Sequence, residues 1–185
     1  MANAAELDAL ERQIDALKAE LRAARQAQLS EVGEYEFAVL NGRRNLSELF
    51  LDKNDLIVVH NMGRSCVYCT SYGDALNGIA AHLQSRTALA MVTPDAPADQ
   101  LQFASSRDWQ FHIVSDDSGA FTSDMGFKTE EGLMPGFSCF YRHEDGRMER
   151  TGFSFFCPGD EFNPIWPYLS MLKEGAGDWS PKYKY

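Results

Sequence analysis

Apolar residues in the first thirty positions recur at alternating spacings of three and four. The stripe consists of Leu7, Leu10, Ile14, Leu17, Leu21 and Ala24, with charged residues between its members. This spacing predicts a helix over residues 3–29 with an a/d heptad seam. Such a seam has to be covered by a partner helix or by the helix's own domain. Residues 1–30 are therefore expected to form an amphipathic segment, and a homodimer through this helix is one expectation.

After residue 34 the pattern changes to short apolar runs that alternate with helical segments. Strands are expected at 35–40, 56–60, 88–92, 111–114, 137–142 and 148–156, and helices at 45–50, 66–84, 96–107 and 164–174. The unbroken β-branched run at 56–60 is typical of a central strand buried on both faces, 111–114 is expected at an edge, and Asp145-Gly146 predicts a hairpin. The order predicts an α/β three-layer sandwich with a mixed central sheet over residues 31–175, followed by an extended tail over 176–185.

Composition narrows the class of protein. The 185 residues are 44% apolar, and 17 Lys+Arg against 27 Asp+Glu give a net charge of −10. Nucleic acid is not expected as a partner, because phosphate binding needs a basic face. A membrane is not expected as a partner either, because no apolar run approaches the roughly 20 residues that a membrane-spanning helix needs. The N-terminus lacks the pattern of an export signal, so a cytoplasmic location with reduced thiols is expected.

The strongest chemical signal is Ser65-Cys66-Val67-Tyr68-Cys69, which follows the buried strand and opens the helix at 66–84. Two cysteines three positions apart at a helix start can close a small disulfide. The helix terminus also stabilises a thiolate there, and a nearby cation, for which Arg64 is a candidate, lowers the cysteine pKa further. We therefore expect Cys66 to be the nucleophile and Cys69, one turn further in, to be the resolving thiol.

Two other interpretations of the pair compete with the dithiol. A zinc site needs four ligands, whereas Cys139 and Cys157 do not form a second Cys-x-x-Cys pair, so neither a metal nor a cofactor is expected. The cysteines could also be incidental in an inactive domain. Cys139 alternates with Phe140 in a strand and is interpreted as a core residue. Cys157 is interpreted as structural in preference to a third redox thiol.

Met134-Pro135-Gly136 immediately precedes the strand at 137–142. Thioredoxin-like folds place a cis-proline at this point, facing the dithiol, with the backbone of the preceding residue available to an extended substrate. We therefore expect Pro135 to be cis and Met134 to contact substrate, with an ordinary proline at a strand entrance as the alternative. His60 ends the central strand. It is either a proton shuttle or a structural histidine whose ring nitrogens are hydrogen-bonded at the end of the strand.

Taken together, the motifs resemble a bacterial thioredoxin-like family labelled domain of unknown function 899, whose members are described as predicted dithiol-disulfide oxidoreductases. The resemblance covers about Leu29 to Leu172. It is carried by Leu46-Ser47-Glu48-Leu49-Phe50, Leu56–Met62, Cys66-x-x-Cys69-x-x-Tyr72-x-Asp74-x-x-Asn77-Gly78, Trp109-x-Phe111-x-x-Val114-Ser115 and Pro135-Gly136-Phe137-Ser138-x-Phe140. It implies a thioredoxin-like fold, Cys66 and Cys69 as the redox pair, and Pro135 at the cis-proline position. The loop 62–65 is shorter than is usual in the family, and Tyr68 is bulky for a position beside the resolving thiol.

The sequence thus favours a thiol-disulfide oxidoreductase that acts on a protein or small-molecule disulfide. A thiol peroxidase related to peroxiredoxins is the first alternative, although Gly63 stands where peroxiredoxins usually carry Thr or Ser, three residues ahead of the reactive cysteine. A non-enzymatic redox-sensing or interaction module is the second. Arg64, Tyr68 and His60 are the residues expected to support the pair.

Overall fold

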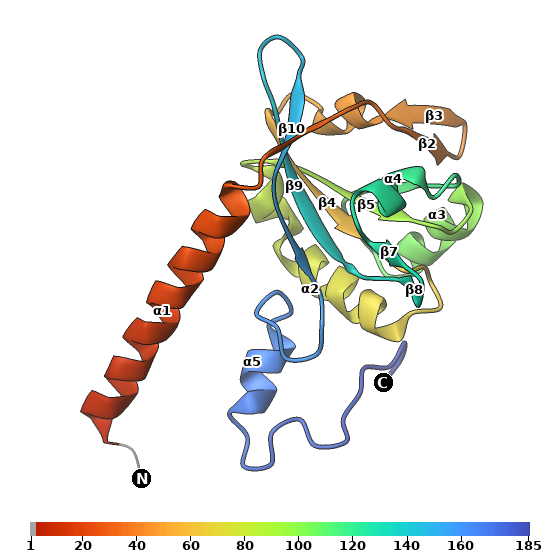
Figure 1. Cartoon of the computed structure of the whole chain (residues 1–185). Coiled ribbons are helices and arrows are strands. Elements are labelled where there is room, and N and C mark those ends of the chain that lie inside the picture. The colour runs from red at the N-terminus through yellow and green to blue at the C-terminus, as the bar shows by residue number, and fades with distance from the viewer. Residues whose placement is uncertain (1–2) are drawn as a thin grey trace.

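The computed structural model describes residues 3–185, so residues 1 and 2 of the predicted N-terminal segment lie outside the described part (Figure 1). Its helices are α1 (Ala4–Gln26), the short 3-10 helix η1 (Leu46–Phe50), α2 (Val67–Gln84), α3 (Pro97–Ser106), α4 (Ala120–Asp124) and α5 (Ile165–Ser170). Its strands are β1 (Ser30–Val32), β2 (Glu36–Val39), β3 (Gly42–Asn45), β4 (Asp55–His60), β5 (Ala88–Thr93), β6 (His112–Ser115), β7 (Lys128–Thr129), β8 (Gly132–Leu133), β9 (Gly136–Arg142) and β10 (Met148–Phe155).

Eight of the strands form one mixed sheet in the order β1-β10-β9-β4-β5-β6-β2-β3. Strands β4, β5 and β6 are parallel, and the other neighbours pair antiparallel. The crossover helices α2 and α3 follow from this, because parallel neighbours cannot be joined by a tight turn. Strand β4, which leads directly to the cysteine pair, lies inside the sheet between β9 and β5, as its β-branched run predicts.

Alternate residues of β4 enter two different cores, one on each face of the sheet. Leu56 and Val58 join the larger core beneath η1 and α4, which includes Phe50 and Phe121. Val59 faces the other way, into the core covered by α2. The sheet therefore separates the helix that carries the cysteines from the aromatic core on its far side. The mixed sheet with helices on both faces confirms the predicted α/β fold class.

The sheet is strongly curled. Strands β1 and β2 stand at or near its opposite edges, yet only residues 33–35 separate them in the chain. A link of this length spans at most about 14 Å, less than half the width of eight strands laid flat at about 4.8 Å spacing. The segment from Val32 to Leu46 crosses the larger core, and its side chains Val32, Tyr35 and Phe37 pack there.

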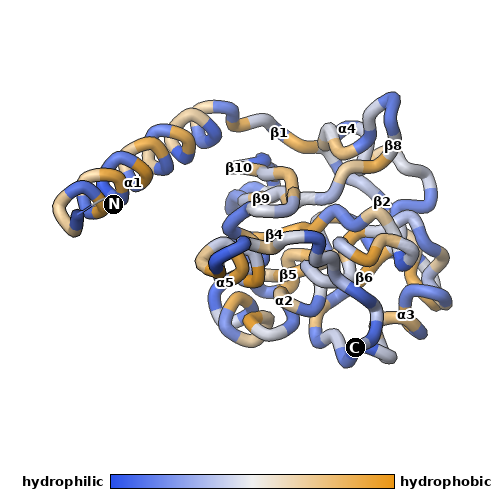
Figure 2. Tube along the Cα trace, turned by 90° about the horizontal axis from the view of Figure 1, so that it is seen from below, coloured by the Kyte–Doolittle hydropathy of each residue, from blue (hydrophilic) through white to orange (hydrophobic). Residues whose placement is uncertain are grey.

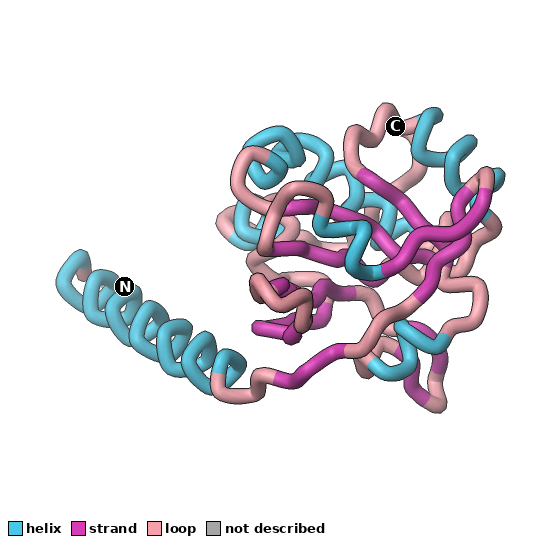
Figure 3. The backbone as a smooth tube through the Cα atoms, turned by 90° about the horizontal axis from the view of Figure 1, so that it is seen from above, coloured by secondary structure: helices cyan, strands magenta, loops and turns pink. Residues whose placement is uncertain are grey.

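Helix α1 projects away from the body of the molecule (Figures 1 and 3). Its predicted apolar stripe is uncovered: Leu7, Leu10, Ile14, Leu17 and Leu21 are 49–64% exposed. Only the C-terminal half of α1 touches the domain, where Lys18 pairs with Glu161 and Arg25 donates to the Ser154 hydroxyl. Within the described residues, no helix has both the length and the apolar character needed to cross a membrane.

Several elements differ from the sequence-based expectation. The segment expected at a sheet edge, β6, has β5 on one side and β2 on the other, so that prediction was wrong. The expected helix over 164–174 ends after Ser170 and continues as tight turns, in which Leu172 and Gly175 bond to carbonyls three residues back. The C-terminal tail lacks regular structure but packs on the domain, where Trp179 meets Trp166 edge to face.

Candidate functional site

The cysteine pair lies at the first turn of α2, directly after the loop that leaves β4. Cys66 is the N-cap residue, and its Sγ accepts a hydrogen bond from the Cys69 N–H at 3.0 Å. Its carbonyl accepts from the Thr70 N–H at 3.0 Å and so begins the helical ladder. The sulfur thus takes the place of the Ser or Asp oxygen that usually satisfies a helix N-terminus.

Cys66 and Cys69 are joined as a disulfide, with their Cα atoms 5.3 Å apart. Cys66 is partly exposed, whereas Cys69 is only 3% exposed. Cys66 is therefore the more accessible residue of the pair, and Cys69 is the covered one. Cys66 as the attacking thiol and Cys69 as the resolving thiol stay a prediction.

The loop before Cys66 is held by two side chains that sequence reasoning did not identify. The Asn61 side-chain oxygen accepts from the Gly63 N–H at 2.7 Å, and Asp95 Oδ2 accepts from the Arg64 N–H at 2.6 Å. Gly63 has φ +104°, a conformation that favours glycine, and a Cβ there would lie 3.3 Å from the Asp95 carboxylate. Because β4 and β5 are parallel neighbours, their carboxyl ends meet, and this adjacency is the signal that could have pointed to Asp95.

The structure places the predicted supporting residues Arg64 and Tyr68 around the pair, but each has a partner elsewhere. The Arg64 guanidinium lies 3.2 Å from the Asp99 carboxylate of α3. The Tyr68 ring stacks on Trp166 of α5, with ring centroids 6.3 Å apart. The Arg64 guanidinium is thus paired with an acid of α3, and the Tyr68 ring packs against α5.

His60 points into the core on the face of the sheet away from α2. Its ring stacks on Phe127 with centroids 3.8 Å apart, its Nε2 lies 3.0 Å from the Ser138 hydroxyl, and it is 2% exposed. Burial, reinforced by the positive charge of Arg150, holds the pKa of His60 well below its ordinary value. The imidazole is therefore neutral. Its Nε2 has a partner, but its Nδ1 is buried with no hydrogen-bond partner in the described part of the chain, so the strand-end histidine is only half satisfied. Its place among the buried aromatic rings of the far core does not fit a proton shuttle to the cysteines.

The expected cis peptide before Pro135 is absent, since the described residues contain no cis bond. The trans chain lets both neighbours of this bond take part in pairing: the Met134 N–H donates to the Phe127 carbonyl at 2.8 Å, and the Pro135 carbonyl accepts from the Phe156 N–H at 2.8 Å. The Met134 side chain is 37% exposed, but its N–H already has an internal partner. A substrate strand would have to displace that bond to pair with the Met134 N–H.

A cluster of polar and aromatic groups covers one flank of α2 beyond Cys69. The Tyr72 hydroxyl donates to Asp160 Oδ2 at 2.7 Å and lies 2.8 Å from the Cys157 carbonyl, while the Trp166 indole N–H donates to that hydroxyl at 3.3 Å. Burial and the bond to the Asp160 carboxylate raise the pKa of Tyr72, so it remains a neutral donor. The exposed Cys157 thus lies in a segment fixed against the cysteine-bearing helix.

The remaining family-motif residues of α2 fasten the helix to the loop before β6. Asp74 pairs with Arg107 and accepts from the Trp109 indole N–H at 2.9 Å. The Asn77 amide spans the loop backbone: it donates to the Asp108 carbonyl at 3.0 Å and accepts from the Gln110 N–H at 2.7 Å. Gly73 is required on the same face, because a Cβ would collide with the Trp109 ring.

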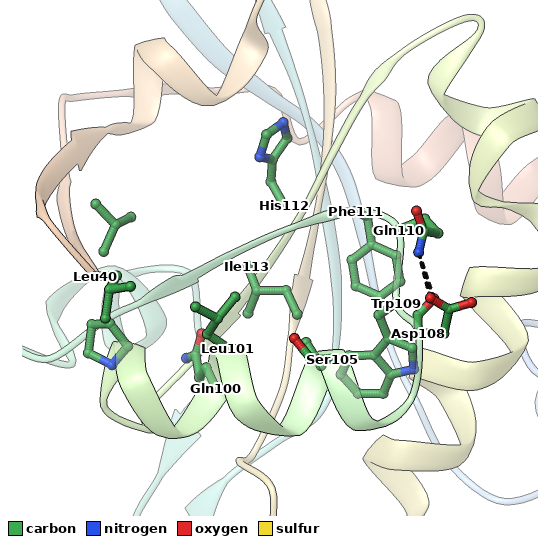
Figure 4. Close-up of a pocket in the computed structure, with 13 residues that line it drawn as sticks. Leu40, Gln100, Leu101, Ser105, Asp108, Trp109, Gln110, Phe111, His112 and Ile113 are labelled. Carbon is green, nitrogen blue, oxygen red and sulfur yellow. Dashed lines mark hydrogen bonds between the residues drawn. The ribbon is translucent and has the colours of Figure 1, made fainter.

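One cavity lies away from the cysteines, between α3 and β6 (Figure 4). It is an open groove of about 460 Å³ with Leu40, Leu101, Trp109 and Ile113 among its lining residues, and neither Cys66 nor Cys69 lines it. The cysteine pair is therefore not part of this groove.

Solved structures with similar folds include peroxiredoxins. Peroxidoxin BcpB from Mycobacterium tuberculosis is 21% identical with a TM-score of 0.55, over 68% of this chain and 83% of the other. A mutant of peroxiredoxin Q from Xanthomonas campestris is 13% identical with a TM-score of 0.58, over 74% and 90%. Reduced Prx3 from Vibrio vulnificus is 12% identical with a TM-score of 0.57, over 71% and 87%. No curated protein sequence matches the chain.

Fold and site together define a thioredoxin-fold protein with a Cys-x-x-Cys disulfide at the head of a helix. Within that class, the chain belongs to the family described as "Bacterial protein of unknown function (DUF899)", whose model matches residues 3–185. The predicted family is thereby confirmed.

Proposed function

We propose that the protein is a thiol-disulfide oxidoreductase that uses Cys66 and Cys69 on a protein or small-molecule disulfide in the cytoplasm. The observation that carries the proposal is the asymmetric pair at the start of α2, with a more accessible Cys66 and a covered Cys69. The hydrogen bond from the Cys69 N–H to Cys66 Sγ supports it, because the same donor would stabilise negative charge on a Cys66 thiolate.

In the reducing direction the reaction has two displacements. The Cys66 thiolate attacks one sulfur of the substrate disulfide, forming a mixed disulfide and releasing the first substrate thiolate. The Cys69 thiolate then attacks Cys66 Sγ, which forms the Cys66–Cys69 disulfide and releases the second thiolate. Two electrons pass from the dithiol to the substrate, and the reverse sequence oxidises a substrate dithiol.

The loop contacts of Asn61 and Asp95 support this chemistry by fixing the backbone on which Cys66 sits. A fixed loop keeps the Cys66 sulfur in line with an incoming disulfide at little further entropic cost. The position of the pair outside the groove between α3 and β6 favours the disulfide of a protein or of a flexible small molecule over a ligand that needs a deep pocket.

The test is the reduction of insulin, with dithiothreitol as electron donor, by the wild type and by Cys66→Ser, Cys69→Ser and Cys157→Ser variants. We expect loss of activity above background in Cys66→Ser. In Cys69→Ser we expect a mixed disulfide with insulin, visible by mass. Cys157→Ser is the control for general thiol loss and should retain activity. Undiminished reduction in both Cys66→Ser and Cys69→Ser would overturn the proposal.

A thiol peroxidase is the second candidate, favoured by the peroxiredoxin folds of the similar structures. Here the Cys66 thiolate would attack a peroxide oxygen, giving a sulfenic acid and water or an alcohol, and Cys69 would condense with it to the disulfide and release water. Gly63 offers no hydroxyl to orient the peroxide. Peroxide consumption far faster than that of a free thiol would favour this reaction. A Cys66 no more reactive than a model thiol would favour a sensing or interaction module.

A further inference from the structure

The most prominent feature that the redox proposal leaves unused is α1. Its five large apolar side chains are about half exposed and recur along one face of the 23-residue helix. The helix itself stands clear of the domain (Figures 2 and 3). Leu7, Ile14 and Leu21 occupy the a positions of the heptad, and Leu10 and Leu17 the d positions. A stripe of this spacing is built to pack against another helix.

Charge is distributed unevenly along the helix. Up to residue 15, α1 carries the acids Glu6, Asp8, Glu11 and Asp15 against the single base Arg12. From residue 16 on, it carries the bases Lys18, Arg22 and Arg25 against the single acid Glu20. Two copies that run antiparallel bring each acidic half beside a basic half, whereas two parallel copies bring like halves together.

The base of α1 also borders a groove that suits the acidic half of a second helix. This groove has a volume of about 370 Å³. Lys18, Arg22 and Arg25 contribute to one wall, where Glu161 pairs with Lys18, and Phe137, Phe153 and Phe162 supply apolar surface. Leu21 lines it too, so the apolar stripe runs continuously from the free end of α1 into the groove. The apolar part of the groove is complementary to Leu7 and Leu10 of a second helix, and the basic side chains of its wall are complementary to the acidic residues beside them.

We propose that α1 pairs antiparallel with α1 of a second copy of this chain, so that the acidic N-terminal half of each helix seats at the groove beside the basic half of the other. In the simplest register, Ile14 of one copy faces Leu17 of the second, and Leu10 faces Leu21. The two domains then lie at opposite ends of the helix pair, each with its own cysteine pair. This inference does not depend on the redox function.

The first test is the molar mass of the full chain by light scattering at about 50 µM. We expect twice the chain mass of 20.7 kDa for the wild type. We expect the single chain mass for Ile14→Glu/Leu17→Glu. The matched control Ala16→Glu/Ala19→Glu adds the same charge to the same turns outside the stripe and should remain a dimer. Insulin reduction by all three proteins shows separately whether the domain is folded and whether the redox proposal holds.

A wild-type monomer would overturn the proposal, as would a stripe variant that still dimerises or a monomer that sediments with phosphatidylglycerol vesicles. Orientation is tested with a nitroxide label on Ala5→Cys in a Cys139→Ala/Cys157→Ala background. Antiparallel pairing places the two labels about 30 Å apart along the helix axis at 1.5 Å per residue. A separation below about 20 Å would show parallel pairing and contradict the charge argument.

Discussion

Individual thiols in this molecule differ in how far water reaches the sulfur. Cys157 is exposed, whereas Cys139 lies in the strand β9 behind α1, where burial raises the pKa of its thiol to about 11. Since the thiolate is the reactive form, Cys139 should remain inert at neutral pH. Cys139 was interpreted as a core residue, but it is only partly buried and lines the groove beside α1, so that prediction was wrong.

Alkylation with iodoacetamide checks this contrast. At pH 8 we expect Cys157 to be modified first, with Cys139 slower by at least about tenfold because so little of it is thiolate. The Cys139 rate should increase with pH up to about 11. Peptide mass mapping over time gives both rates in one sample. Equal rates at pH 8 would show that Cys139 is not shielded.

His60 should make the folded state sensitive to mild acid. Its pKa in the folded protein is lowered by burial, so below about pH 6.5 the unfolded chain takes up a proton that the folded chain does not. The contribution of the neutral His60 ring to the free energy of unfolding is therefore complete above about pH 6.5 and is lost as the pH falls below it. We expect the free energy of unfolding to fall by up to about 1.4 kcal/mol per pH unit from this group. Urea unfolding at pH 7.5 and 5.5 should show a smaller decrease in His60→Asn. The same decrease in both proteins would contradict the assignment.

At the scale of elements, the contact between α2 and the loop before β6 decides where the cysteine-bearing helix sits. Asn77→Ala removes two hydrogen bonds to the backbone of residues 108 and 110. We expect it to lower the free energy of unfolding by about 1–3 kcal/mol, because the freed loop groups lose their partners. The control is Gln84→Ala, which removes a single bond to the Gln110 carbonyl and should cost less. Chemical denaturation measures the free energy of unfolding of both variants. A larger decrease in Gln84→Ala than in Asn77→Ala would contradict the prediction.

Elements with a long or strongly apolar pattern were predicted well from sequence, and short polar ones were not. Helices α1 and α2 were predicted from the periodicity of their apolar residues. The buried strands β4 and β5 were predicted from their unbroken apolar runs. Strand β3 was missed because its residues Gly42–Asn45 are polar and pair on one side only, and β1 because it buries only Val32. Helix α4 is five residues long, too short to show a period. Such elements are fixed by tertiary contacts that a local pattern does not carry.

In the candidate site, too, local features could be predicted from sequence and contacts between distant segments could not. The position of Cys66 and Cys69 at a helix start follows from local sequence, since strand, motif and helix are contiguous. Asp95, Asp160 and Trp166 reach the same region from distant parts of the chain; the parallel pairing of β4 and β5 could have pointed to Asp95, but nothing near Asp160 or Trp166 in sequence indicates their partners. The cis geometry expected at Pro135 depended on the fold class; the bond is trans, with the Met134 N–H bonded to the Phe127 carbonyl and the Pro135 carbonyl bonded to the Phe156 N–H.

At the scale of the whole molecule, two bodies with different roles are joined by a short connection. The domain holds its own core and the cysteine pair, while α1 contributes no buried residue and extends the molecule outwards. Disulfide exchange and self-association are thereby placed on separate parts of the chain. A variant that abolishes one is expected to leave the other measurable, and the two proposals can be tested independently.

The curl of the sheet has a consequence for solubility. Sheet edges with free N–H and C=O groups recruit strands from other molecules, the first step in aggregation. Here one edge is the three-residue β1 and the other is β3, which carries the exposed charges of Arg43 and Arg44. The three-residue link between β1 and β2 also prevents the sheet from flattening into a surface that a foreign strand could extend. The eight-stranded sheet of this acidic chain is thus protected from fibril-like growth at both edges, which leaves the apolar stripe of α1 as a surface for ordered association.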